Sequence, residues 1–93
     1  METVLIKEVA EILSLSEHDV ERDSLKTFLE TRLRTLLAEK LSLTRRYGVS
    51  NIDEMESFYA QQKLSEKDSW EDFFELSHIE AEIAAVKKAL QKI

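Results

Sequence analysis

The sequence predicts an all-α protein of three to four helices, dominated by two long amphipathic helices in a hairpin or coiled-coil-like bundle. Helix-forming residues run through the whole chain, which has no proline and one glycine in 93 residues. Apolar residues recur at steps of three and four, the period of one helix face, and no alternating pattern indicates a strand. The length predicts a single helical domain over residues 1–93.

A first helix is expected at roughly residues 3–13, where the apolar residues have close to helical spacing. The segment 14–16 interrupts this helix because serine prefers helix ends to helix interiors. Ser16 is a good N-cap for a second helix. Glu17 and Asp19 follow it in the first turn, where acidic side chains suit the helix dipole.

The second helix is expected to contain about 30 residues and to measure about 45 Å. Its apolar stripe runs from Val20 to Tyr47, again in steps of three and four. Arg45 and Arg46 are favourably placed in its last turn. Gly48 then supplies the left-handed residue that commonly ends a helix.

A short third helix and a long fourth helix complete the prediction. Ser50 is the expected N-cap of the third helix, with Asp53 three residues on as a variant of the capping box. Ser65 or Asp68 is expected to cap the fourth. The fourth helix has a seam with coiled-coil spacing, formed by Leu76, Ile79, Ile83, Val86, Leu90 and Ile93. This seam predicts self-association, with a dimer favoured, although the two long helices could also pair within one chain.

The charges are arranged in blocks along the chain, with an overall net charge of −6. Residues 32–47 hold five basic side chains and one acidic one, a net charge of +4. Residues 48–75 hold eight acidic and two basic side chains, a net charge of −6. The acidic balance disfavours nucleic acid and favours a basic protein partner.

The location is expected to be the cytoplasm, since the chain has no cysteine and begins with no secretory signal. No apolar stretch approaches the roughly 20 residues needed to span a bilayer, so no membrane association is expected.

The sequence predicts no enzyme: we expect no catalytic residue, no cofactor and no metal site. His18 and His78 are the only histidines, and neither pairs with a second strong ligand at the spacing of a zinc site. A single glycine cannot build a glycine-rich phosphate loop. The acidic cluster at residues 66–72 lacks the spacing and central glycine of a calcium loop.

Residues 8–22 have the rhythm of a helix-turn-helix, which leaves a DNA-binding regulator as the alternative function. Ala10 is small, Ser14 stands where the turn usually has glycine, and Ser16 caps the next helix. The would-be recognition helix, however, is acidic. Its charge opposes an approach to phosphates.

The densest aromatic patch is Ser69-Trp70-Glu71-Asp72-Phe73-Phe74-Glu75-Leu76. Trp70 and Phe73 extend the seam of the fourth helix, which predicts that both pack on the second helix. The other interpretation is a partner surface of aromatic anchors rimmed by carboxylates. Its predicted partner-binding residues are Trp70, Glu71, Asp72, Phe73, Phe74 and Glu75.

Three segments of the chain resemble the small acidic antitoxin-like proteins of prokaryotic type II toxin–antitoxin loci. They are the serine-capped segment 15–29, the helix-ending turn 45–50 and the aromatic-acidic segment 70–76. The resemblance implies a small, helical, non-enzymatic protein that binds and restrains a cognate toxin. Many antitoxins have a basic N-terminal DNA-binding arm, whereas residues 1–31 here are acidic.

The expected function is therefore a non-catalytic protein-interaction module of antitoxin type. Its expected partner is a basic toxin.

Overall fold

The computed structural model describes residues 3–93 as four α-helices, with no strand in that range. The helices are α1 (Thr3–Leu13), α2 (Glu17–Tyr47), α3 (Ile52–Ala60) and α4 (Glu66–Leu90). The predicted all-α class with two dominant helices is confirmed. The molecule is a rod with principal dimensions of 61 × 20 × 18 Å.

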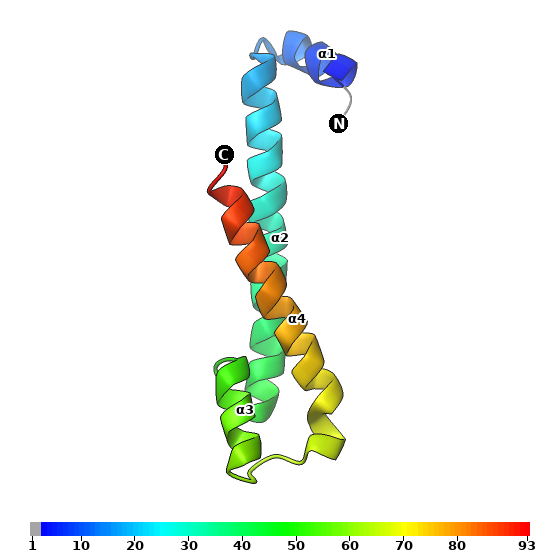
Figure 1. Ribbon diagram of the computed structural model, residues 1–93. Helices are drawn as coiled ribbons and strands as arrows, with labels where there is room; N and C mark the ends of the chain where they lie inside the picture. The colour runs from blue at the N-terminus through cyan, green and yellow to red at the C-terminus, as the bar shows by residue number, and fades with distance from the viewer. Residues whose placement is uncertain (1–2) are drawn as a thin grey trace.

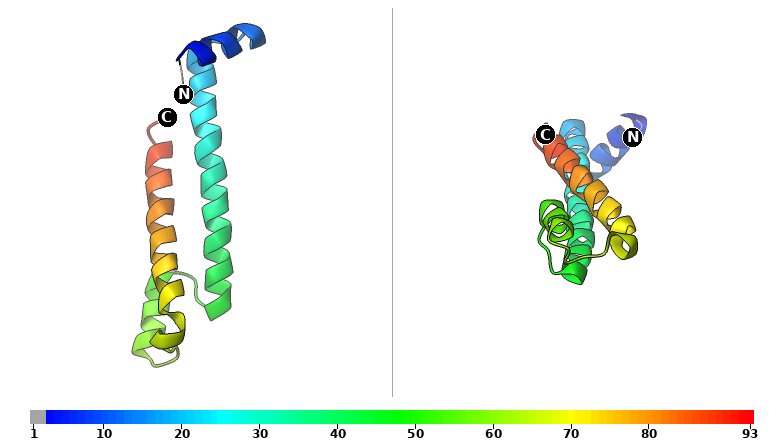
Figure 2. Two further views of the ribbon diagram at one scale, coloured as in Figure 1. Left: turned by 90° about the vertical axis from the view of Figure 1, so that its right-hand side faces the viewer. Right: turned by 60° about the horizontal axis from the view of Figure 1, so that its bottom comes forward.

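The long helices α2 and α4 lie side by side as a hairpin, which Figures 1 and 2 show from several directions. The short helix α3 lies at the closed end of the hairpin and packs against α4. At the opposite end, α1 crosses the start of α2 (Figure 1). There α2 extends past the end of α4, so its N-terminal part has no α4 beside it.

The core lies in the half of the hairpin next to α3, between α2, α4 and the segment that joins them. Leu36, Met55 and Leu76 are its most completely enclosed side chains. The buried cluster consists of Leu36, Leu43, Val49, Met55, Leu76, Ile79 and Ile83. The two long helices thus bury their apolar stripes against each other within one chain.

This packing uses the first half of the seam that the spacing predicted. Leu76, Ile79 and Ile83 are buried in the core of the same chain, and Val86 packs against that core. Leu90 is half-buried, and Ile93 is 36% exposed. The seam therefore forms the inside of the hairpin, and little of it remains accessible to a second copy.

Among residues 3–93, three residues with left-handed backbone conformation follow the ends of helices, although the sequence has only one glycine. They are Ser14 with φ 58°, Gly48 with φ 67° and Gln62 with φ 58°. At Gly48 the predicted helix stop is confirmed: the N–H of Gly48 donates to the carbonyl of Arg45, and that of Val49 to Thr44. This is the Schellman pattern, and the same pair of bonds recurs around Ser14 and Gln62.

The helix starts follow the sequence prediction in two cases and depart from it in one. Ser16 accepts a hydrogen bond from the N–H of Asp19 at 3.0 Å, as expected of the N-cap of α2. Ser65, one of the two predicted caps, holds the N-cap position of α4, although its side chain makes no capping hydrogen bond. The prediction of Ser50 for α3 was wrong, because Asn51 is the cap and accepts from the N–H of Glu54 at 2.8 Å.

The reason for this shift lies in tertiary structure. The carboxylate of Glu80, on α4, accepts a hydrogen bond from the N–H of Ile52 at 2.7 Å. That bond satisfies a donor in the first turn of α3 and fixes the helix start one residue later.

Ion pairs along the hairpin account for much of the charge pattern. Arg32 pairs with Glu82, Lys40 lies 3.7 Å from Glu80, and Arg46 lies 2.8 Å from Asp72. Each pair joins the basic block of α2 to an acidic residue of α4. Partly exposed pairs of this kind contribute only about 0–1 kcal/mol each, so their main effect is on the alignment of the two helices.

Candidate protein-interaction surface

Two aromatic side chains at the start of α4 face solvent. Trp70 is 52% exposed and Phe74 is 62% exposed. They lie four residues apart, so they share one face of the helix, and their rings make an edge-to-face contact at 6.1 Å. The predicted packing of Trp70 on the second helix was wrong. Phe73 is half-buried and packs against the core, as predicted.

The exposed rings are held in place by further aromatic contacts. Phe73 meets Phe74 at 5.8 Å and Tyr59 of α3 at 5.6 Å, both with edge-to-face geometry. The four rings therefore form a continuous row from α3 to the outer face of α4. Such contacts are each worth about 0.5–1.5 kcal/mol beyond simple burial, so the exposed pair rests on an ordered support.

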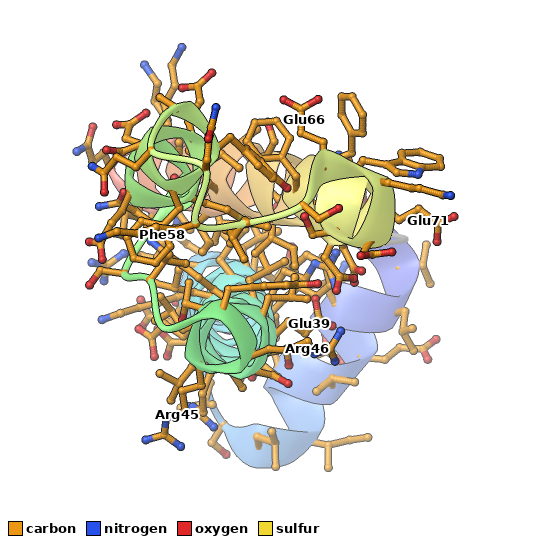
Figure 3. All side chains as sticks on the ribbon, turned by 90° about the horizontal axis from the view of Figure 1, so that it is seen from below. Glu39, Arg45, Arg46, Phe58, Glu66 and Glu71 are labelled. Atoms are coloured by element: carbon orange, nitrogen blue, oxygen red, sulfur yellow. The ribbon has the colours of Figure 1, made fainter. Side chains whose placement is uncertain are left out.

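A depression of about 430 Å³ lies along this row of rings. Its lining consists of Glu56, Tyr59, Glu66, Trp70, Phe73 and Phe74. Glu66 and Glu71 project from the first turns of α4, away from α2 (Figure 3). The depression thus combines aromatic faces with carboxylates, two kinds of group that both attract cations.

A buried hydrogen-bond relay fixes one wall of the depression. Ser69 is 4% exposed, and its hydroxyl donates to the carbonyl of Ser65 at 2.7 Å. The hydroxyl of Tyr59 lies 2.6 Å from the same Ser69 oxygen. Because Ser69 has only one hydroxyl proton and uses it on Ser65, Tyr59 must donate to Ser69. This bond joins α3 to α4 beside the aromatic row.

Asp72 is bonded to α2 and does not line the depression. Its carboxylate accepts hydrogen bonds from the Tyr47 hydroxyl and from Arg46, both at the end of α2. The Tyr47 bond, supported by Arg46, lowers the pKa of Asp72. The same bond raises the pKa of Tyr47. Arg46 is thereby held toward α4, whereas Arg45 points away from it (Figure 3).

Five of the six predicted partner-binding residues therefore lie in or beside the depression, and one does not. Trp70, Phe73 and Phe74 line the depression, and Glu71 and Glu75 are exposed beside it. Asp72 faces α2.

The structure also adds Glu56, Tyr59 and Glu66, which the sequence analysis did not select. Glu56 and Tyr59 come from α3, and only the tertiary fold brings them to α4. The sequence signal that could have indicated these residues was the presence of aromatic and acidic side chains together in α3.

The segment 8–22 does form two helices joined by a turn, and Ser14 takes the left-handed conformation at that turn. Its second helix is the start of the 31-residue α2, with Glu17 and Asp19 in its first turn. A groove approach by this helix would bring those carboxylates toward phosphates, which opposes binding.

The two histidines are exposed. His78 lies 2.7 Å from Glu82 on the same helix, in an i, i+4 pair. Within residues 3–93 no group of three or more potential metal ligands is arranged around a common point. None of the described helices is both long and apolar enough to cross a membrane.

Fold and surface together define an all-α helical-hairpin protein with an exposed aromatic and acidic face. The chain belongs to the Uncharacterized protein MJ0235 family, whose family model matches residues 1–93. No curated protein and no solved structure matches the chain significantly.

Proposed function

We propose that this protein is a non-catalytic interaction module that binds a basic protein partner through the face around Trp70 and Phe74. The exposure of these two large aromatic residues is the observation that carries the proposal. Large apolar side chains held open at the surface are informative, because aromatic residues dominate the energetic centres of protein interfaces.

The surroundings of the two rings favour a cationic group. A lysine or arginine side chain over the Trp70 ring would gain about 0.5–2 kcal/mol from the ring's negative face. Glu56 and Glu66 line the same depression and offer carboxylates to the same cation. Glu71 and Glu75 add negative charge at the rim. We therefore expect a partner that presents one or more basic side chains.

The charge of the basic block 32–47 supports this assignment of the binding face. Arg32, Lys40 and Arg46 are engaged with acidic residues of α4. The carboxylates that α4 presents around Trp70 lie on its other side. Acidic side chains thus accompany the exposed aromatic rings, which suits a basic partner.

The finer proposal is that the partner is a toxin encoded beside this protein, as the resemblance to type II antitoxins implies. An antitoxin acts by occupying a surface of its toxin, so it needs an interface and no catalytic group. The face described here meets that need. The resemblance extends over roughly residues 15–76, which include the start of α4 with Trp70 and Phe74.

The test is co-purification with the product of the neighbouring gene. The complex is then quantified by the fluorescence of Trp70, the chain's single tryptophan. We expect a complex at micromolar concentration, a shift of the Trp70 emission on binding, and weaker binding at high salt. The double variant Trp70→Ala/Phe74→Ala, followed by light scattering, should weaken the complex at least about tenfold. Leu37→Ala is the matched control, since Leu37 is 45% exposed on another helix, α2, and does not line the depression.

Each outcome has a defined meaning. No complex at micromolar concentration would overturn the toxin proposal. A complex that the Trp70→Ala/Phe74→Ala variant leaves unchanged would place the interface elsewhere. A complex with a neighbour that does not inhibit growth when expressed alone would support the interaction module and overturn the antitoxin role.

A further inference from the structure

A second apolar surface lies at the N-terminal end of the rod, far from Trp70. It is formed by α1, the turn after it and the first half of α2. Seven large apolar side chains there are between 46% and 81% exposed. They are Val4, Leu5, Ile12, Leu13, Leu15, Leu25 and Phe28, and we call them the N-terminal apolar surface.

The chain does not cover this surface by itself. Helix α1 packs on α2 with Ile6 and Ala10, which are buried, while the other apolar residues of α1 remain more accessible. Helix α4 ends before it reaches the start of α2 (Figures 1 and 2). Leu25 is 46% exposed beside Ile93, which follows α4, and Phe28 is 66% exposed.

We propose that a second copy of this chain covers the N-terminal apolar surface, giving a dimer joined through α1 and the first half of α2. The size of the surface agrees with this. Exposed fractions of 46–81%, applied to side chains of about 150–200 Å² each, give at most roughly 750 Å² per chain. Complete coverage in both copies would bury about 1,500 Å², within the range of a specific and stable interface.

The surface also has a hollow that a second copy could fill. Leu25 and Ile93 line an open groove of about 450 Å³, with His18, Glu21, Arg22 and Lys92 around them. Phe28, three residues along the same helix, is 66% exposed and projects beside the groove. A two-fold axis would place the projecting Phe28 of each copy toward the groove of the other, so that one contact is made twice.

The chemistry of the surface argues against other occupants. Residues 3–31 contain seven acidic and three basic side chains, which disfavours an anionic lipid surface or a nucleic acid. The surface is rich in large apolar side chains, as are interfaces between identical chains, which are more apolar than the rest of a protein surface.

The shape of the chain agrees with a dimer as well. A single chain has a radius of gyration of 19.2 Å, against about 12 Å for a compact domain of this length, so its own core is small. Self-association commonly supplements a core of that size.

The experiment is light scattering and sedimentation of the full chain at about 1–100 µM, in low and high salt. We expect twice the chain mass of 10.8 kDa, and tighter association at high salt because the acidic rims are then screened. Ile12→Ser/Phe28→Ser should raise the dimer dissociation constant at least about tenfold. Leu37→Ser/Leu41→Ser is the matched control, since these leucines are 45% and 48% exposed elsewhere on α2.

Far-UV circular dichroism shows whether each variant keeps its helix content. A monomer at 100 µM would overturn the proposal. A dimer that responds to Val86→Ser/Leu90→Ser and not to Ile12→Ser/Phe28→Ser would also overturn it and would return self-association to the α4 seam. None of these measurements involves the basic partner. The dimer and the partner-binding proposal can therefore fail independently, and their opposite salt dependence separates them.

Discussion

Replacing Gly48 with alanine should lower the free energy of unfolding by about 1 kcal/mol. Gly48 has a φ of 67°, a conformation in which the Cβ of an L-residue crowds the backbone. A Cβ built at this position meets no heavy atom within 4 Å beyond the chain neighbours of Gly48. Backbone strain is therefore the only expected penalty, and the substitution measures it without a steric clash.

The magnitude follows from two opposing effects. The left-handed conformation costs a residue with a Cβ about 1–2 kcal/mol. Alanine also stiffens the unfolded chain, which returns about 0.4–1 kcal/mol. The net loss is about 1 kcal/mol, or about 4–8 °C in melting temperature for a chain of this size. Gly48→Val should lower the free energy of unfolding at least as much, because a β-branched residue tolerates positive φ poorly.

The assay is urea unfolding followed by far-UV circular dichroism at fixed protein concentration. Gln62→Gly is the matched variant, because Gln62 closes the same type of turn with φ 58° but has a Cβ. It should raise the unfolding free energy. If Gly48→Ala leaves the unfolding free energy unchanged and Gln62→Gly gives no gain, the strain argument is refuted.

Two further predictions concern the hairpin. Leu36→Ala should lower the unfolding free energy by about 2–5 kcal/mol, whereas Leu37→Ala should change it by less than about 1 kcal/mol. Leu36 is 1% exposed and its neighbour Leu37 is 45% exposed. Urea unfolding of the two variants therefore compares the loss of a buried leucine with the loss of an exposed one in the same helix. Equal losses would contradict the assigned core. Asp72→Asn should remove a pH-dependent part of stability, because bonds from Tyr47 and Arg46 lower the pKa of Asp72 in the folded state. That stability is present above the ordinary carboxyl pKa of 3.8 and is lost as the pH falls through the lowered one, so the two unfolding curves should converge in acid. A constant difference down to about pH 2 would contradict it.

Local sequence signals predicted the helices and several of their ends. Ser16 and Gly48 act where their side-chain chemistry and backbone freedom predict. The apolar spacing of α4 predicted the buried positions Leu76, Ile79 and Ile83 correctly. Spacing alone could not decide whether these residues meet another copy or the same chain. The connection through α3 decides this, since it folds α4 back along α2.

The candidate site was only partly predictable, for two physical reasons. Asp72 stands four residues before the buried Leu76, so helical geometry turns it toward α2. Reading the aromatic-acidic segment as one patch ignored that geometry. Glu56 and Tyr59 belong to another helix, and their place beside Trp70 depends on tertiary packing. The left-handed conformations of Ser14 and Gln62 could not be predicted either, because the helix ends impose them on residues that are not glycine.

The three bridges between α2 and α4 imply an order of assembly. Arg46 and Asp72 are separated by 26 positions, whereas Arg32 and Glu82 are separated by 50. The entropy lost on closing a loop increases with its length, so the contact beside α3 is the least expensive to form. Once that contact is made, each bridge further along the hairpin closes only a short additional segment. We therefore expect the hairpin to form from its closed end, with the end that carries Leu90 joining last.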